Sequence, residues 1–153
     1  MSKNSKIVYF LITILFFIVL DIYFSNLIID NIQNCPNNPV FDIIFVQNTG
    51  AAFSILENSK MFLIIFAIVA SLGIIIFVLK NILKISTMSL LLTAMLVAGI
   101  LCNMFERISL GYVRDFFKLN FINFPVFNIS DVFINIGVIA LLFVIIKNNY
   151  IKK

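Results

Sequence analysis

The 153-residue sequence has no histidine, only two cysteines and few charged residues. Without histidine, neither a Ser-His nor a Cys-His nucleophile pair can form, and the usual zinc sites are excluded. The two cysteines, Cys35 and Cys102, do not have the spacing of metal ligands, and we do not expect a disulfide between them. Charged residues make up 12% of the chain, against roughly 25% in a soluble domain. An ordinary soluble protein is therefore excluded.

Apolar residues dominate instead, at 62% of the chain, with a mean hydropathy of +1.13. A bilayer core about 30 Å thick takes roughly 20 helical residues per crossing. Four runs approach that length: residues 7–29, 61–79, 85–105 and 124–146. They are continuously apolar rather than alternating, which favours helices over β-barrel strands. We predict an all-α membrane protein with four transmembrane helices, forming one polytopic domain over residues 1–153.

The distribution of basic residues predicts the orientation of these helices. Four crossings place both termini and the loop near residue 82 on one side, with seven basic residues against four on the other. By the positive-inside rule the termini are cytoplasmic. This distribution also accounts for the net charge of +4 without a nucleic-acid partner. All seven acidic residues fall on the opposite, outer side: Asp21, Asp30, Asp42, Glu57, Glu106, Asp115 and Asp131.

Two outer segments connect the helices. Residues 31–59 contain the β-prone stretch 40–46, followed by Asn-Thr-Gly as a turn, which predicts a strand. We expect a small β-containing platform at the extracytoplasmic membrane surface. The second segment, residues 106–125, mixes aromatic and basic residues and is expected to form an interfacial layer.

Ionisable residues near membrane spans are costly and are therefore candidates for function. Asp131 lies sixteen residues before Lys147, which corresponds to about 24 Å of helix and places it near the outer boundary of the hydrocarbon. Asn128, Asp131 and Asn135 have i, i+3, i+7 spacing and are expected to form one polar stripe. That stripe has to face protein or a water-filled pocket.

A second polar group closes the third span. Asn103, Glu106 and Arg107 share a helix face, and Asp115 follows eight residues after Arg107. Asp21 ends the first span at a similar depth, so we expect polar groups from three helices to converge on one outer layer. Simpler roles stay open, including an ion pair between Glu106 and Arg107 and interhelical hydrogen bonds from the asparagines.

Two carboxyl groups held close together in a low-dielectric site cannot both ionise readily. One then acts as a base on water while the other donates a hydrogen bond to a carbonyl. A Ser-Lys dyad of Ser54 and Lys60 is a further possibility. An ion or proton carrier that uses the same acids, and a non-catalytic scaffold, are the other classes considered.

Taken in order, the motifs resemble those of the lipoprotein signal peptidase (signal peptidase II) family. The family's first aspartate is matched by Asp21, and its Asn-x-Gly-Ala-Ala-Phe-Ser stretch by "NTGAAFS" at residues 48–54. The later motifs are matched by "CNMFER" (102–107), "VRDF" (113–116) and "FNISD" (127–131). Order, spacing and the four-helix layout agree across nearly the whole chain.

The resemblance implies an aspartic endopeptidase of the bacterial cytoplasmic membrane. Its substrates would be diacylglyceryl-modified prolipoproteins, cleaved just before the lipidated cysteine near the outer face. Asp115 and Asp131 fall on the family's catalytic pair. The supporting or substrate-binding positions are Asn48, Gly50, Asn103, Arg107, Asn128, Asp21 and Glu106. We expect a monomer that contacts membrane lipid, with no metal and no cofactor.

The sequence departs from the family pattern at four positions. Ser25 stands where the family usually has lysine, and Cys102 replaces the glycine before Asn103. Glu106 replaces the common aspartate and Ser130 replaces alanine. Both aspartates of the expected pair are retained.

Overall fold

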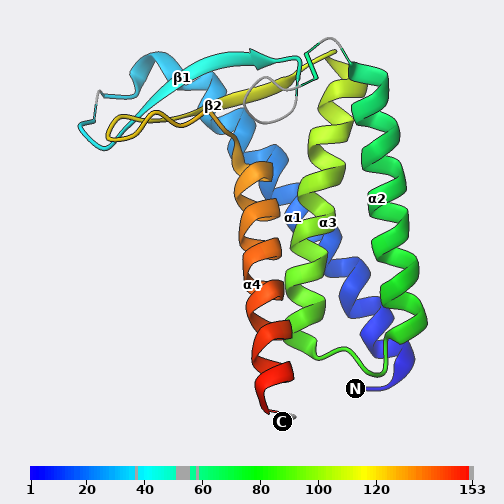
Figure 1. The fold of residues 1–153 in the computed structure, drawn as a ribbon. Helices are drawn as coiled ribbons and strands as arrows, with labels where there is room; N and C mark the ends of the chain where they lie inside the picture. Colours follow the sequence, from blue (N-terminus) through cyan, green and yellow to red (C-terminus); the bar gives the residue numbers. More distant parts are fainter. Residues whose placement is uncertain (37, 51–55, 58, 152–153) are drawn as a thin grey trace.

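The computed structural model describes residues 1–36, 38–50, 56–57 and 59–151 and is mostly helical (Figure 1). Its elements are α1 (Lys3–Asp30), η1 (Ile32–Asn34), β1 (Phe41–Asn48), α2 (Lys60–Asn81), α3 (Thr87–Ser109), β2 (Val113–Leu119) and α4 (Ile129–Ile151). The predicted helical fold with a small β-containing platform is confirmed. Both termini lie at the end of the bundle opposite the strands (Figure 1).

The helices are long, apolar segments with polar caps. Ser2 and Ser86 cap the N-termini of α1 and α3 by accepting hydrogen bonds from backbone N–H groups three residues on. Helices α1, α2 and α3 are each long and apolar enough to cross a membrane. In α4 the described apolar part is shorter, Ile129–Val144. Many of their outward-facing apolar side chains are exposed, as expected of a surface that meets lipid.

Helix α4 begins later than the apolar run that predicted it. The run starts at residue 124, but the helix starts at Ile129. Phe127 is instead extended and bridges Phe117 of β2, with hydrogen bonds of 3.1 and 2.8 Å between their backbones. Pro125 also disfavours helical conformation in the residue before it.

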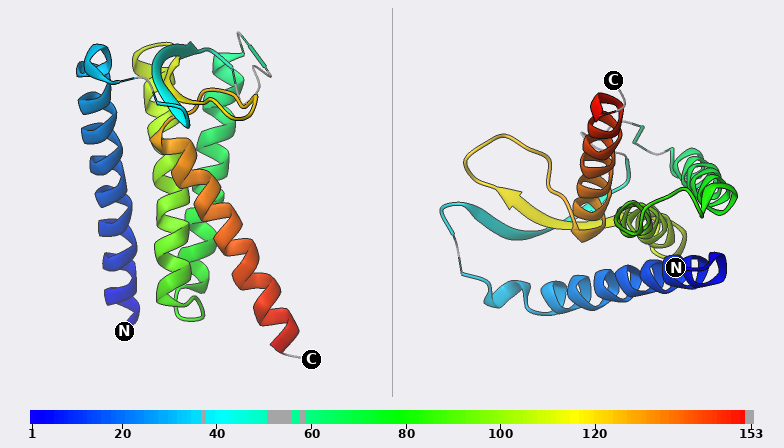
Figure 2. Two further views of the ribbon diagram at one scale, coloured as in Figure 1. Left: turned by 90° about the vertical axis from the view of Figure 1, so that its left-hand side faces the viewer. Right: turned by 90° about the horizontal axis from the view of Figure 1, so that it is seen from below.

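Helix α3 is the centre of the bundle and packs against α1, α2 and α4 (Figure 2). Its buried residues form the core with Phe10 of α1 and Val78 of α2. Helix α4 crosses α3 obliquely and lies close to it at two glycines, Gly99 and Gly137. A Cβ on Gly99 would lie 2.6 Å from the Ser130 carbonyl oxygen, and one on Gly137 would lie 2.9 Å from Leu96. The glycines therefore allow the close approach that carries the start of α4 onto α3.

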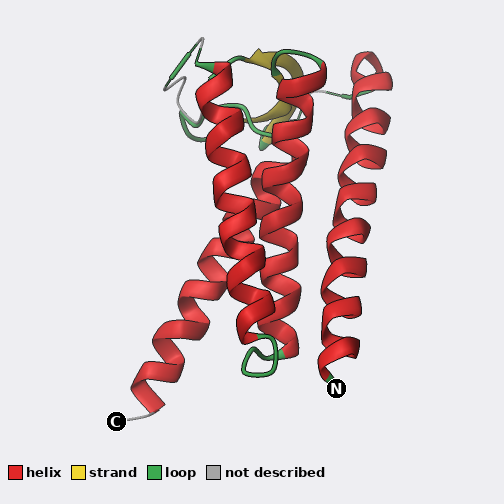
Figure 3. Ribbon diagram, turned by 90° about the vertical axis from the view of Figure 1, so that its right-hand side faces the viewer, coloured by secondary structure: helices red, strands yellow, loops and turns green. Residues whose placement is uncertain are grey.

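The platform is a two-stranded antiparallel sheet across one end of the bundle (Figure 3). Strand β1 confirms the strand predicted over residues 40–46. Its partner β2 lies in the segment that we expected to be only an interfacial layer. The register pairs Val46 with Asp115 and Asn48 with Val113, and it shifts between Ile43 and Val46. This pairing brings the segment before α2 next to the segment after α3.

Candidate active site

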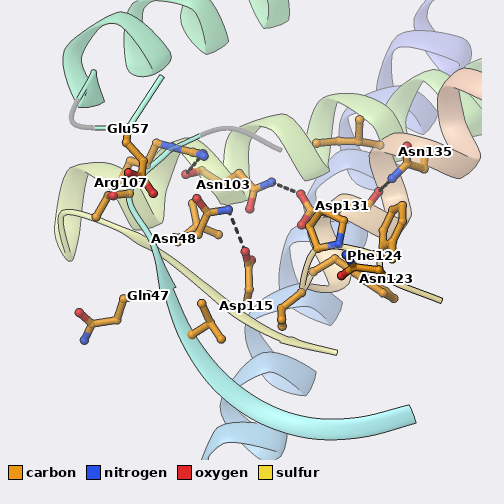
Figure 4. Close-up of a pocket in the computed structure, with 17 residues that line it drawn as sticks. Gln47, Asn48, Glu57, Asn103, Arg107, Asp115, Asn123, Phe124, Asp131 and Asn135 are labelled. Atoms are coloured by element: carbon orange, nitrogen blue, oxygen red, sulfur yellow. Dashed lines mark hydrogen bonds between the residues drawn. The ribbon is translucent and has the colours of Figure 1, made fainter. Parts of the chain in front are cut away.

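A pocket of about 810 Å³ opens where the sheet meets α3 and the start of α4 (Figure 4). Five of the residues expected to be functional line it: Asn48, Asn103, Arg107, Asp115 and Asp131. They come from β1, α3, β2 and α4, so chain segments far apart in sequence meet here. Gly50 and Asn128 are hydrogen-bonded to members of this group.

The cap of α4 positions Asp131. Asn128 immediately precedes the helix, and its side-chain oxygen accepts a hydrogen bond of 2.8 Å from the Asp131 backbone N–H. In return, the Asn128 backbone N–H donates to Asp131 Oδ2 at 3.2 Å. These reciprocal bonds form a capping box. The expected polar stripe is thus only partly helical, since Asn128 lies outside the helix, while Asn135 donates to the Asp131 carbonyl at 2.9 Å.

Asp115 is buried on β2, with 2% of its surface exposed. Its two carboxylate oxygens accept hydrogen bonds of 2.8 Å each from the side-chain amides of Asn48 and Asn128. Burial and, next, the nearby charge of Asp131 raise the pKa of the Asp115 carboxyl from 3.8 to about 7, against the lowering effect of the two amides and of Arg107. The group therefore holds a proton at a pH where an exposed aspartate is ionised.

Asparagine side chains connect the two carboxyl groups. Asn103 donates to Asp131 Oδ1 at 2.8 Å, and its own side-chain oxygen accepts a bond of 3.0 Å from Asn128. The Asn128 side chain thus donates to both Asp115 and Asn103, while its backbone N–H donates to Asp131. All four carboxylate oxygens have an amide donor. The asparagines do form interhelical hydrogen bonds, as one simpler interpretation held, and the same side chains also bind the carboxyl groups.

Hydrogen bonds from Arg107 link the chain after β1 to α3. Its guanidinium donates to the Gly50 carbonyl at 2.7 Å and to the Asn103 carbonyl at 3.1 Å. The Gly50 N–H donates to the side chain of Asn48 at 2.9 Å, which orients that amide towards Asp115. The buried Nε of Arg107 has no hydrogen-bond partner among the described residues.

Asp21 and Glu106 lie outside this pocket. Both line a second pocket of about 530 Å³ between α1 and α3. Asp21 accepts a hydrogen bond of 2.6 Å from Ser130, the residue before Asp131. Glu106 forms an ion pair with Arg114, with 2.6 Å between Oε1 and Nη2, and not with Arg107, the partner that the simpler interpretation had left open. The single polar layer expected from the sequence is thus divided between two pockets.

Sequence reasoning missed Arg114 and several polar residues that line the larger pocket, such as Gln47, Glu57 and Asn123. The Asn-x-x-Asp spacing of the α4 cap was a usable signal for the capping box, whereas nothing local indicated the Arg114 contact. Ser54 of the possible Ser-Lys dyad lies outside the described residues, as does the whole Ala-Ala-Phe-Ser stretch, residues 51–54. Among the residues described, no group of three or more acids and cysteines is placed to hold a metal ion.

Known proteins are similar to this chain over most of its length. The family model described as Signal peptidase (SPase) II matches residues 13–147. A lipoprotein signal peptidase of Enterococcus faecalis is 35% identical over 151 residues, covering 96% of this chain and 92% of that protein. One from Streptococcus thermophilus is 36% identical over 108 residues, covering 71% and 70%.

Two solved bacterial membrane enzymes have the same fold. One, determined by the in meso method at 2.3 Å, superposes with a TM-score of 0.81 at 27% identity, covering 94% of this chain and 91% of its own. The other, at 1.9 Å, gives a TM-score of 0.68 at 26% identity and covers 94% of both. Because the family model spans most of the chain, this bacterial membrane protein belongs to the signal peptidase II family, whose proteases remove signal peptides from lipoproteins.

Proposed function

We propose that this protease is an aspartic endopeptidase with Asp115 and Asp131 as its catalytic dyad. It cleaves diacylglyceryl-modified prolipoproteins just before the lipidated cysteine. The observation that carries this proposal is the shared contact of both carboxyl groups with Asn128, in a pocket that is large enough to hold a peptide segment. An ion carrier has no need for such a paired arrangement.

The dyad works with one proton between its two carboxyl groups. The ionised carboxylate takes a proton from a water molecule, which attacks the scissile carbonyl carbon. The protonated partner donates a hydrogen bond to the carbonyl oxygen as negative charge develops there. The proton taken from water then passes to the leaving amine. The raised pKa of Asp115, about 7, supports a pair that retains one proton near neutral pH.

The remaining polar residues orient the dyad and the substrate. Asn103 and Asn128 hold the carboxyl groups, while Asn48 reaches Asp115 from β1. Arg107 connects the Gly50 backbone to α3 and adds positive charge near the site. Asp21 and Glu106 act from the second pocket through their neighbours rather than on the substrate.

The substrate's position follows from its lipid anchor. Its acyl chains stay in the bilayer, so the scissile bond lies near the membrane boundary, which is where the sheet end of the bundle carries the pocket. Helices α2 and α4 both pack on α3 and make little direct contact with each other among the described residues, which leaves lateral access from lipid. We propose that both termini are cytoplasmic and that the site faces the outer side of the bacterial cytoplasmic membrane. The enzyme acts as a monomer without a cofactor.

Cleavage of a lipidated prolipoprotein by purified protein in detergent tests the dyad. We expect wild type to cleave before the lipidated cysteine, and Asp115→Asn and Asp131→Asn to be inactive although folded. Asp42→Asn is the matched control, since Asp42 lies on β1 outside the pocket and should retain activity. Full activity in either folded dyad variant would refute the dyad, and an inactive wild type would reopen the carrier hypothesis.

A further inference from the structure

Arg114, the residue directly before Asp115, is held by a set of contacts that the proposed chemistry does not use. Its backbone N–H donates to Glu106 Oε2 at 2.7 Å, and its Nε donates to Glu106 Oε1 at 2.7 Å. Nη2 lies 2.6 Å from the same Oε1, and Nη1 donates to Asn26 Oδ1 at 3.1 Å. Glu106 of α3 thus binds both the backbone N–H and the guanidinium of Arg114, and Asn26 of α1 binds the guanidinium at Nη1.

Arg114 and Asp115 point to opposite faces of β2, because successive side chains alternate along a strand. Asp115 lines the larger pocket, whereas Arg114 lines the second pocket with Glu106 and Asn26. Strand β2 therefore carries the Asp115 carboxyl group on one face, and Arg114 binds α1 and α3 on the other face. This second pocket lies behind the strand that carries Asp115.

The contact is strong enough to matter for geometry. The side chains of Arg114 and Glu106 are 21% and 13% exposed, so water screens the ion pair less than at an open surface. Glu106 accepts three hydrogen bonds or charge contacts, including one from a backbone N–H that cannot move without moving the strand. Strand β2 also pairs with β1 and bridges Phe127 before α4, and the contact with Glu106 links it to α3.

Helix α3 also carries Asn103, which binds Asp131. The bonds between Glu106 and Arg114 therefore fix β2, which carries Asp115, to α3. The same helix binds Asp131 through Asn103. We infer that Arg114 and Glu106 are positioning residues, which set the location of Asp115 relative to Asp131. This inference rests on the proposed dyad, and it assigns a purpose to the glutamate that replaces the family's usual aspartate.

The test is a double-mutant cycle of Arg114→Met, Glu106→Gln and the two together, measured by prolipoprotein cleavage with separate kcat and KM. Lys118→Met is the matched control, since it removes a cation from the same face of the same strand and lies outside both pockets. Misplacing a catalytic group by about 1 Å costs up to about 100-fold in rate. We expect each single variant to lose about 10-fold to 100-fold in kcat with little change in KM.

The pattern of the losses separates positioning from a general loss of stability. The double variant should be little worse than either single variant, because both remove one shared contact. Arg114→Lys should recover part of kcat, and the pH profile of kcat should shift in the defective variants because the environment of Asp115 changes. Lys118→Met should match wild type in both kcat and pH profile.

Two results would overturn the inference. One is wild-type kcat and pH profile in folded Arg114→Met, and the other is fully additive losses in the double variant. If Arg114→Met does not fold, the same kinetic measurements are made on Glu106→Asp. This variant keeps the negative charge, but its side chain is one methylene shorter and reaches Arg114 less well. Absence of cleavage by wild type would instead refute the proposed function, so the two failures are distinguishable.

Discussion

At the scale of single residues, Asn128 is the side chain on which the site depends most. It caps α4 by accepting a hydrogen bond from the Asp131 backbone N–H, and it donates one to the Asp115 carboxyl group. Asn128→Ala should remove both contacts, while the bond from the backbone N–H of residue 128 to the Asp131 carboxyl group is kept. Loss of the cap costs about 1 kcal/mol of stability, whereas misplacement of the dyad should lower kcat about 100-fold. Cleavage kinetics alongside thermal unfolding in detergent measure both effects. Unchanged kcat in the folded variant would contradict the role of Asn128.

The buried Asp115 makes stability depend on pH. Its pKa is about 7 in the folded protein and 3.8 when exposed, so between these values the folded state binds more protons than the unfolded state. The stability that this group contributes is present at low pH and is lost as the pH rises towards about 7. Asp115→Asn should therefore become more stable relative to wild type from pH 4 to pH 7. Melting temperatures across this range measure the difference, and a constant difference would contradict it.

At the scale of elements, the close contact of α3 and α4 determines where Asp131 lies. In Gly99→Ala the new Cβ would meet the Ser130 carbonyl oxygen at 2.6 Å, directly before Asp131. Overpacking of this kind costs about 1–3 kcal/mol, and displacing the start of α4 should also lower kcat about 10-fold. Gly73→Ala is the control, because nothing lies within 4 Å of its Cβ. Equal melting temperatures and activities for the two variants would show that the contact is unimportant.

At the scale of the whole molecule, the orientation proposed from charge can be tested with cysteine labelling. Cys35 lies near the sheet, and Lys84 lies between α2 and α3 at the opposite end. In intact cells a membrane-impermeant maleimide should label Cys35 in the wild type. A Cys35→Ser, Lys84→Cys variant should react only after the cells are permeabilised, because that end faces the cytoplasm. Labelling of this variant in intact cells would reverse the proposed orientation.

The sequence by itself determined the helical membrane fold, because each apolar run encodes its own helix through local composition and length. It also determined one strand and the candidate residues, since motif order is a linear property. Tertiary structure alone decided that β2 pairs with β1, because that contact joins segments about 70 residues apart and leaves no local pattern. It also decided that Glu106 pairs with Arg114 rather than Arg107. Side-chain partners across elements depend on how the helices and the sheet pack, which helical spacing does not specify.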